Sequence, residues 1–270
     1  MDTIDRFLEE DLNAEGDITS KALFTNEKGT GIISVKEACV IAGLDEAALV
    51  FNKLGATFHP LVSDGDQVKK NTSIAEITGT LTSILTGERL ALNFLGRMSA
   101  IATATRNLVD RCKKINPSIQ IAATRKTTPG FRKYEKKAVQ IGGGEPHRFG
   151  LYDAIMIKDN HIKAVGSVKE SIQRAKKVKN KIIEVEVENE TDAMTAAQLN
   201  VDVIMLDNFD AKNAEKIAKQ IRKNNSSILI EISGGINPDN IIEYASFADR
   251  ISMGYLTHSV KNKDISLELK

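Results

Sequence analysis

The segment IIEVEVENETDAMTAAQLNVDVIML, residues 182–206, contains the repeat that decides the fold. It begins and ends with short runs of β-branched and other apolar residues, and the apolar residues between these runs have helical spacing. A strand, a helix and a second strand in this order form a βαβ unit, whose two strands lie parallel. The segment therefore predicts a parallel sheet with helices packed against it.

The same alternation extends in both directions along the chain, from about residue 115 onward. Strand-like runs occupy residues 119–124, 154–157, 182–187, 203–206, 228–232 and 250–253. Helix-like spacing is found in residues 167–180, 190–200, 210–225 and 237–245. Three of these helical segments begin with a serine, aspartate or asparagine, which suits an N-cap. The pattern predicts a parallel α/β sheet, either open or closed into a barrel.

The first hundred residues have a different pattern. Residues 31–44 resemble strand sequence interrupted by a glycine, residues 45–55 a helix that ends at a glycine, and residues 63–79 short strands joined by turns. These features predict an α+β domain, which a long helical stretch over residues 83–113 connects to the next domain. We therefore place the boundary near residue 110.

Two domains are thus expected, an α+β domain over residues 1–110 and an α/β barrel domain over residues 111–270. The C-terminal segment NKDISLELK could return to either domain. At 270 residues with 41% hydrophobic content, the chain can bury a substantial core. Global disorder is excluded.

Composition narrows the class of function. The formal net charge of +1 argues against a nucleic-acid partner bound by overall charge. No apolar run approaches the roughly 20 residues that span a bilayer, and the acidic start of the chain is unlike a secretory signal. We expect a cytoplasmic protein without a membrane partner. Cys39 and Cys112 lack the spacing of zinc or redox motifs and are expected to be reduced core thiols.

Polar residues at the ends of the expected strands indicate a site. In parallel α/β folds, ligands bind at the carboxyl ends of the strands, where loops and helix N-termini converge. The residues found at these ends are Arg125, Lys126, Lys158, Asp159, Asn160, Glu186, Asp207, Asn208, Ser233, Gly234, Gly235 and Gly254. One such position alone would mean little, but a polar residue after nearly every strand favours a shared site.

The sequences SGGI and SMGY follow the last two strands and offer exposed backbone amides to a phosphate. Either loop alone is more often a plain turn. Because they are neighbours at the end of the βα series, where barrels often bind phosphate, we favour a phosphate site.

Seven lysines and arginines lie between Arg125 and Arg148. Three of them, Lys133, Lys136 and Lys137, fit an ordinary basic helix face. A different group, Arg125, Lys126, His147 and Arg148, lies at a strand end or beside the glycines 142–144, and predicts a small polyanionic substrate. Glu186 and Asp207 could hold ribose hydroxyls or Mg²⁺, or could simply be charged strand ends. The other histidines, His59, His161 and His258, are expected to be structural.

Several motifs together resemble a known family. The segment TRKTTPGFRKYEKKAVQIGGGEPHRFGLYDAIMIKDNHI, with EGDITS, GERLALNFLGRMSAIATATR, EVEVENETDA, IMLDNF, EISGGI and ISMGYLTHS, closely resembles quinolinate phosphoribosyltransferases over nearly the whole chain. The resemblance implies an N-terminal α/β sandwich, an incomplete α/β barrel and a head-to-tail homodimer. It also implies transfer of the phosphoribosyl group of phosphoribosyl pyrophosphate to the ring nitrogen of quinolinate, with loss of one carboxylate as CO₂.

Residue roles follow from the same resemblance. Arg125, His147 and Arg148 would surround the dicarboxylate, beside the turn formed by glycines 142–144. The implied catalytic residues are Lys126, Lys158, Glu186 and Asp207, of which Glu186 and Asp207 would also bind ribose and Mg²⁺. Phosphate would be bound by Ser233, Gly234, Gly235, Ser252, Met253 and Gly254. Arg89 would be supplied to the site of the partner subunit.

Three alternatives stay open. A related group associated with molybdenum transport resembles this family, although retention of KDNH favours the quinolinate enzymes. A nicotinate-using phosphoribosyltransferase would need fewer cations for its single carboxylate. A non-catalytic sensor of phosphate ligands would not need the acidic residues Glu186 and Asp207.

Overall fold

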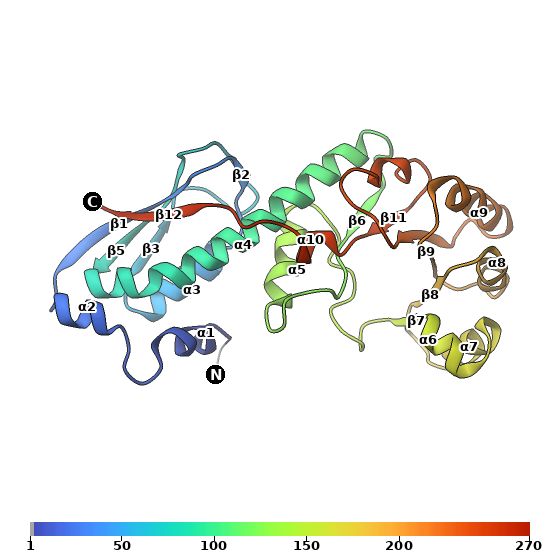
Figure 1. Cartoon of the computed structure of the whole chain (residues 1–270), viewed down its shortest axis with the longest axis horizontal. Helices are drawn as coiled ribbons and strands as arrows, with labels where there is room; N and C mark the ends of the chain where they lie inside the picture. The colour runs from blue at the N-terminus through green and yellow to red at the C-terminus, as the bar shows by residue number, and fades with distance from the viewer. Residues whose placement is uncertain (1–2) are drawn as a thin grey trace. The chain divides into compact units, whose positions relative to one another are not determined.

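The computed structural model describes residues 3–270 and divides into two compact units (Figure 1). The first unit contains the residues up to Ala104 together with Gln140–Gly142 and Val260–Lys270. The second unit contains Thr105–Val139 and Gly143–Ser259. The division therefore falls inside one long helix, α4 (Leu81–Lys113).

The first unit is built around an antiparallel sheet with strand order β12-β1-β5-β3. Apolar side chains at alternating positions of β1 and β5, among them Ile33, Val35 and Ile77, are fully buried. The C-terminal segment left undecided by the sequence forms β12 and pairs with β1, from Gly31↔Leu269 to Val35↔Ile265. Besides α4, the elements of this unit are α1 (Thr3–Leu12), α2 (Ile18–Leu23), β1 (Lys28–Val35), β2 (Cys39–Val40), α3 (Leu44–Lys53), β3 (Thr57–Pro60), β4 (Gln67–Val68), β5 (Ser73–Thr80) and β12 (Ile265–Leu269).

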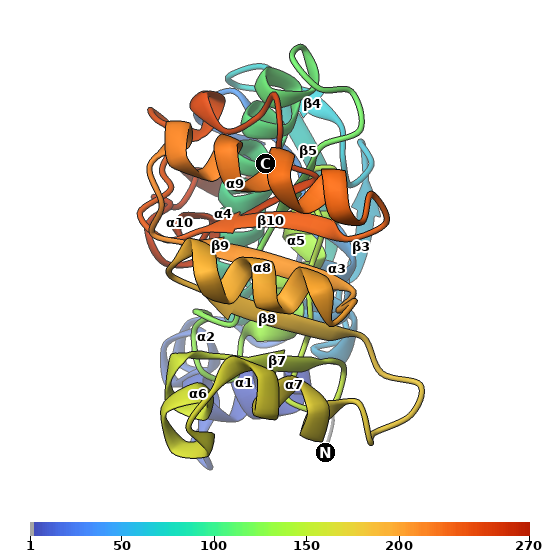
Figure 2. The ribbon, with the colours of Figure 1, turned by 90° about the vertical axis from the view of Figure 1, so that its right-hand side faces the viewer.

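The second unit is built around a six-stranded parallel sheet with strand order β6-β11-β10-β9-β8-β7. Helices α7, α8 and α9 cover one face of this sheet (Figure 2). The elements are β6 (Gln120–Ala122), α5 (Arg132–Ile141), β7 (Ile155–Ile157), α6 (Asp159–Val165), α7 (Val168–Ala175), β8 (Ile183–Val187), α8 (Glu190–Gln198), β9 (Val203–Asp207), α9 (Ala211–Asn224), β10 (Leu229–Ser233), a 3₁₀ turn (Ile241–Glu243), β11 (Arg250–Ser252) and α10 (Tyr255–His258).

The pairing of the strands makes this sheet an open barrel. The last strand, β11, pairs with the first, β6, whereas β6 and β7 do not pair. On its other edge β6 forms a single parallel bridge, between Ala122 and Glu145. The segment that follows the three glycines therefore lies beside the free edge of β6. The predicted α/β class, with an N-terminal sheet domain and an incomplete barrel, is confirmed.

One predicted helix is wrong. Residues 237–245 form only the 3₁₀ turn Ile241–Glu243. The side chain of Asn237 accepts hydrogen bonds from the amides of Asp239 and Asn240, and that of Asn240 accepts one from the amide of Asn237. Asparagine side chains that bond nearby amides compete with helical hydrogen bonding, so the segment begins as a turn.

Within residues 3–270, no helix combines the length and the apolar character needed to cross a bilayer. Cys39 and Cys112 are free and buried, as predicted. Burial raises the pKa of both thiols.

Candidate active site

A pocket of about 500 Å³ opens at the carboxyl ends of the barrel strands. Its lining includes eleven of the residues that the sequence singled out: Arg125, Lys126, His147, Arg148, Lys158, Glu186, Asp207, Ser233, Gly234, Gly235 and Ser252. Met253 and Gly254 line an adjoining pocket of about 300 Å³, which shares Lys126 and Ser233–Gly235 with the first. The fold thus brings together residues that lie more than 120 positions apart in the sequence.

Strand alternation explains which side chains reach the pocket. Along β8, Glu184 and Glu186 share one face because they are two positions apart, and the same holds for Glu231 and Ser233 along β10. Glu186 and Ser233 lie at the strand ends and line the pocket. Glu184 and Glu231 lie one layer deeper, with side chains 3% and 0% exposed.

The pocket holds three cations without an acidic partner. Among residues 3–270, no carboxylate lies within ion-pairing distance of Arg125, Lys126 or Arg148. Burial lowers the pKa of Arg148, and the positive charge of Arg125 lowers it further. Because like charges repel in a partly dehydrated pocket, a bound dianion would relieve this unfavourable arrangement.

Lys158 is arranged differently, because its ammonium group forms an ion pair with Glu186. The backbone of Lys158 is fixed by the next helix, where Nδ1 of His161 accepts a hydrogen bond of 3.0 Å from the Lys158 amide. His161 therefore has a structural role, as predicted.

Asp207, Asn208 and Gly234 form a tight loop at the ends of β9 and β10. The side-chain amide of Asn208 donates to Asp207 at 2.6 Å, and the backbone of Asn208 has φ of +59°. A Cβ atom at Gly234, whose φ is +81°, would lie 2.3 Å from the Asn208 side chain. Glycine is therefore required here by the neighbouring loop itself, and the loop leaves Ser233–Gly235 exposed along the pocket wall.

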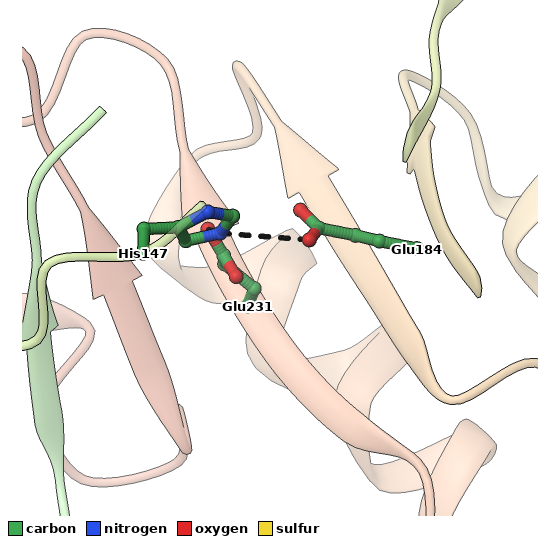
Figure 3. Close-up of side chains that lie close together, drawn as sticks. All are labelled: His147, Glu184 and Glu231. Atoms are coloured by element: carbon green, nitrogen blue, oxygen red, sulfur yellow. Dashed lines mark ion pairs between the residues drawn. The ribbon is translucent and has the colours of Figure 1, made fainter. Parts of the chain in front are cut away.

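His147 lies in a buried cluster with Glu184 and Glu231 (Figure 3). Its Nε2 atom is 3.4 Å from Oε1 of Glu231 and 3.5 Å from Oε2 of Glu184. Its Nδ1 atom accepts a hydrogen bond of 2.8 Å from the backbone amide of Arg148. Both ring nitrogens thus face protein groups, and neither is free for a ligand in this arrangement.

The two carboxylates of the cluster have different environments. Burial and the neighbouring Glu231 raise the pKa of Glu184 to about 8. The pKa of Glu231 is lowered although burial opposes this shift, because His147 and the Arg250 guanidinium, 2.6 Å away, stabilise its charge. Glu184, Glu231 and Arg250 were not among the sequence candidates. The alternation in IIEVEV and ILIEIS could have identified both glutamates as inward-facing.

In and below the pocket, two groups of side chains could be considered for a metal ion. Glu186 and Asp207 offer carboxylate oxygens in the open pocket, which suits Mg²⁺ bound together with substrate phosphates and water. The cluster of His147, Glu184 and Glu231 has the right donor atoms, but Nδ1 of His147 accepts an N–H, so the neutral ring carries its proton on Nε2. A protonated Nε2 is not a ligand atom, and this cluster does not fit a metal.

The three consecutive glycines do not line the pocket. Gly143 has φ of +88°, and a Cβ atom at Gly144 would lie 2.8 Å from the carbonyl oxygen of Ile121 on β6. The sequence suggested that these glycines turn the backbone beside the substrate. The structure gives another reason: Gly144 lets the chain approach β6 closely enough to form the Ala122–Glu145 bridge.

The structure also shows where two other predicted residues, Arg89 and Lys136, lie. Arg89 is exposed on α4, within the first unit, and is not among the residues that line the pocket. Lys136 does not belong to a solvated basic face, because it is fully buried. Its ammonium group donates to the Pro146 carbonyl and lies 5.4 Å from the centre of the Phe149 ring.

Comparison with known proteins agrees with this geometry. Residues 17–99 match the N-terminal domain of quinolinate phosphoribosyl transferase, and residues 101–268 match the C-terminal domain. A Methanocaldococcus jannaschii protein named probable nicotinate-nucleotide pyrophosphorylase (carboxylating) is 45% identical over 262 residues, which cover 94% of this chain and 92% of the relative. A Bacillus subtilis protein of the same name is 40% identical over 271 residues, covering 98% and 92%.

A solved structure supports the match in three dimensions. The nicotinate-nucleotide pyrophosphorylase of Francisella tularensis superposes with a TM-score of 0.92 at 36% identity, covering 99% of this chain and 94% of that one. Sequence and fold agree along both units. The chain therefore belongs to the quinolinate phosphoribosyl transferase family.

Proposed function

We propose that this chain converts quinolinate and phosphoribosyl pyrophosphate into nicotinate mononucleotide, pyrophosphate and CO₂, a step of NAD biosynthesis. The observation that carries the proposal is the group of three unpaired cations, Arg125, Lys126 and Arg148, in one pocket. Quinolinate has two adjacent carboxylates on a pyridine ring, and two guanidinium groups match two carboxylates. The names of the relatives agree with this activity.

The second substrate would occupy the acidic and glycine-rich part of the pocket. The loops at Ser233–Gly235 and Ser252–Gly254 would bind its phosphate groups through exposed amides. Glu186 and Asp207 would hold the ribose hydroxyls and, with water and pyrophosphate oxygens, Mg²⁺. When bound, Mg²⁺ would supply positive charge against the leaving pyrophosphate.

In the transfer step, the bond from ribose C1 to the pyrophosphate oxygen breaks and a bond from C1 to the pyridine nitrogen forms. Lys126 and Lys158 would stabilise the charge that builds up on the departing pyrophosphate. The pair formed by Lys158 and Glu186 would open or rearrange when that substrate binds. Positioning of the two substrates then accounts for much of the rate increase.

In the second step, the bond between the ring and one carboxylate breaks and CO₂ leaves. The electron pair stays on the ring carbon, next to the newly cationic ring nitrogen, and then takes up a proton. Arg125 and Arg148 would hold the ring in place throughout, because their guanidinium groups also bind the carboxylate that is retained.

The assembly and location are part of the same proposal. A homodimer would let Arg89 of the partner subunit complete each pocket. The two buried free thiols suit a reducing compartment, so we propose a cytoplasmic enzyme.

The test is release of labelled CO₂ from carboxyl-labelled quinolinate. Release should require both phosphoribosyl pyrophosphate and Mg²⁺, and should stop when EDTA is added in excess. Turnover of nicotinate without turnover of quinolinate would show a different phosphoribosyltransferase. Tight binding of both substrates without any product would instead indicate a sensor.

A further inference from the structure

His147 occupies a backbone conformation that needs support. Its φ is +55°, in the left-handed region that residues with a side chain rarely adopt. His147 and Arg148 line the pocket and also line a second cavity of about 610 Å³, whose wall includes Asn200, Asp202 and Ser227 near the opposite ends of the strands. With space on both sides, packing alone does not hold these two residues. Polar contacts must supply the constraint.

The ring of His147 makes the first such contact. Nδ1 accepts the hydrogen bond from the Arg148 amide, so the ring fixes the main chain of a residue that lines the pocket. The guanidinium of Arg148 donates to the sulfur of Met156, which lines the same pocket. A neutral imidazole that accepts at Nδ1 carries its proton on Nε2. The orientation of the ring then depends on the hydrogen-bond acceptors near this Nε2–H group.

Two carboxylates lie beyond Nε2, each on a different strand of the barrel. Glu184 is on β8 and Glu231 is on β10, and Arg250 on β11 holds Glu231 at 2.6 Å. Among the described residues, Nε2 of His147, Oε1 of Glu231 and Oε1 of Glu184 are buried without a hydrogen-bond partner. The oxygens nearest to Nε2 are Oε1 of Glu231 at 3.4 Å and Oε2 of Glu184 at 3.5 Å. The two carboxyl groups are therefore the acceptors available to the Nε2–H group, and the strands that carry them determine where the ring lies.

We propose that Glu184 and Glu231 are positioning residues for the anion pocket: they hold His147 with its proton on Nε2, and His147 in turn holds the main chain of Arg148. Glu184 does not line the pocket, and Glu231 lines it with a side chain that is fully buried. The proposal rests on the proposed function, because it treats the anion bound by Arg148 as quinolinate. It assigns a role to a buried layer of ionisable side chains, which the core of a barrel does not need for packing.

The kinetic test uses Glu184→Gln, which keeps the shape of the side chain but replaces the carboxyl group that faces His147 with an amide, whose N–H groups can turn toward Nε2. We expect KM for quinolinate to rise about tenfold or more, since a misplaced charge-assisted contact is lost. KM for phosphoribosyl pyrophosphate should change by less than about twofold, because the loops proposed for its phosphate groups follow β10 and β11, and Glu186 on β8 is held separately by Lys158. Equal changes for both substrates would indicate general damage to the barrel and overturn the proposal, as would no change in either.

Two comparisons separate positioning from direct contact. In a His147→Asn background, where asparagine tolerates the positive φ, adding Glu184→Gln should raise KM for quinolinate no further. An independent, additive effect would show that Glu184 does not act through His147. As a control, Asp249→Asn changes a carboxylate that bonds Arg222 at 2.8 Å and the Ile230 amide but does not contact His147, and it should leave the ratio of the two KM values unchanged.

A spectroscopic measurement is independent of turnover. In the ¹⁵N spectrum of the four histidines of the wild-type protein, the signals absent from His147→Asn belong to His147. Near neutral pH they should show an unprotonated Nδ1 and a protonated Nε2. A protonated Nδ1 would overturn the proposal. If the wild type does not convert quinolinate, the proposed function fails while this spectrum still decides whether the cluster holds the ring as described.

Discussion

Arg148 contributes to the pocket through two groups, its guanidinium and its backbone amide. The variant Arg148→Lys keeps the positive charge and the amide but loses the planar fork that binds a carboxylate with two parallel hydrogen bonds. We expect KM for quinolinate to rise by a factor that corresponds to about 1.5–3 kcal/mol, with a much smaller change for phosphoribosyl pyrophosphate. Steady-state kinetics with each substrate varied in turn measures this.

A matched control is Arg174→Lys, because Arg174 lies on α7 in an exposed ion pair with Glu170. That change should leave both KM values as they are. If Arg148→Lys weakened both substrates equally, Arg148 would lie outside the dicarboxylate site.

Lys136 makes stability depend on pH. Burial lowers its pKa to about 8, and the nearby charge of Arg132 acts in the same direction. Below pH 8 the folded and unfolded states both carry the proton, and the folded state bears the full cost of burying the charge. Between pH 8 and about 10.5 the unfolded chain holds more protons than the folded one, so folding becomes more favourable as pH rises.

The measurement compares the free energy of unfolding of the wild type with that of Lys136→Met, whose side chain does not titrate. The difference should shift in favour of the wild type by up to about 3 kcal/mol between pH 7 and the upper end of this window. Lys133→Met, at an exposed position of the same helix, should show no such trend. If the difference in unfolding free energy between the wild type and Lys136→Met did not change with pH, burial of the Lys136 ammonium group would not lower its pKa.

Much of the site could be predicted from single polar residues at strand ends, because the carboxyl ends of parallel strands converge and ligands bind there. Lys158, Glu186 and Asp207 were found in this way and line the pocket. Lys136 could not be found, because its helical spacing resembles that of its exposed neighbours. What buries Lys136 is the segment Pro146–Phe149, and the sequence does not show that this segment folds over it.

At the scale of elements, the segment between α5 and β7 depends on Gly144. A Cβ atom there would lie 2.8 Å from the Ile121 carbonyl oxygen and 2.9 Å from a methyl group of Val139, and neither the strand nor the helix can move freely. We expect Gly144→Ala to destabilise the fold by about 1–3 kcal/mol and to weaken quinolinate binding, since the displaced segment carries His147 and Arg148. Denaturant unfolding and KM for quinolinate measure the two effects.

Gly150→Ala is the matched control within the same segment. The three atoms nearest to the new methyl group all belong to the ring of Tyr152, which is 74% exposed and can rotate away. Stability close to that of the wild type is expected. A Gly144→Ala protein as stable as this control would show that the bridge to β6 does not need the glycine.

The elements predicted best were those whose apolar residues are regularly spaced in the sequence. All six barrel strands were expected within one or two residues of their bounds, because a run of β-branched residues between helical segments has few other solutions. Less regular elements were missed. The strand β3 (Thr57–Pro60) has only four residues and ends in a proline, and the segment at 237–245 was taken for a helix although asparagine turns disrupt it.

At the scale of the whole molecule, the chain reaches its fold through contacts that sequence order does not suggest. The last strand, β12, completes the sheet of the first unit by pairing with β1, at least 230 residues earlier. The sequence could not decide this, because both domains expose strand edges to which a short amphipathic strand could add. Family resemblance, rather than periodicity, supplied the expectation that two chains combine.

That expectation can be tested through Arg89, which is exposed on α4 and does not line the pocket among the described residues. We expect Arg89→Ala and Lys158→Ala to be inactive when expressed singly. Co-expression forms mixed dimers, in which one of the two pockets combines an intact Lys158 with Arg89 of the partner subunit. Random pairing should restore about a quarter of the wild-type activity, since half of the dimers are mixed and half of their sites are intact.

A pocket completed within one chain predicts the opposite result. Every site of a mixed dimer would then carry one of the two changes, and activity would not exceed that of either parent. The control is co-expression of Arg89→Ala with Asp207→Ala: Asp207, like Lys158, lies in the second unit and lines the pocket, so this pair should recover to the same extent. Mixed dimers shown to be present but inactive in both pairs would remove Arg89 from the pocket and leave it as a surface residue of α4.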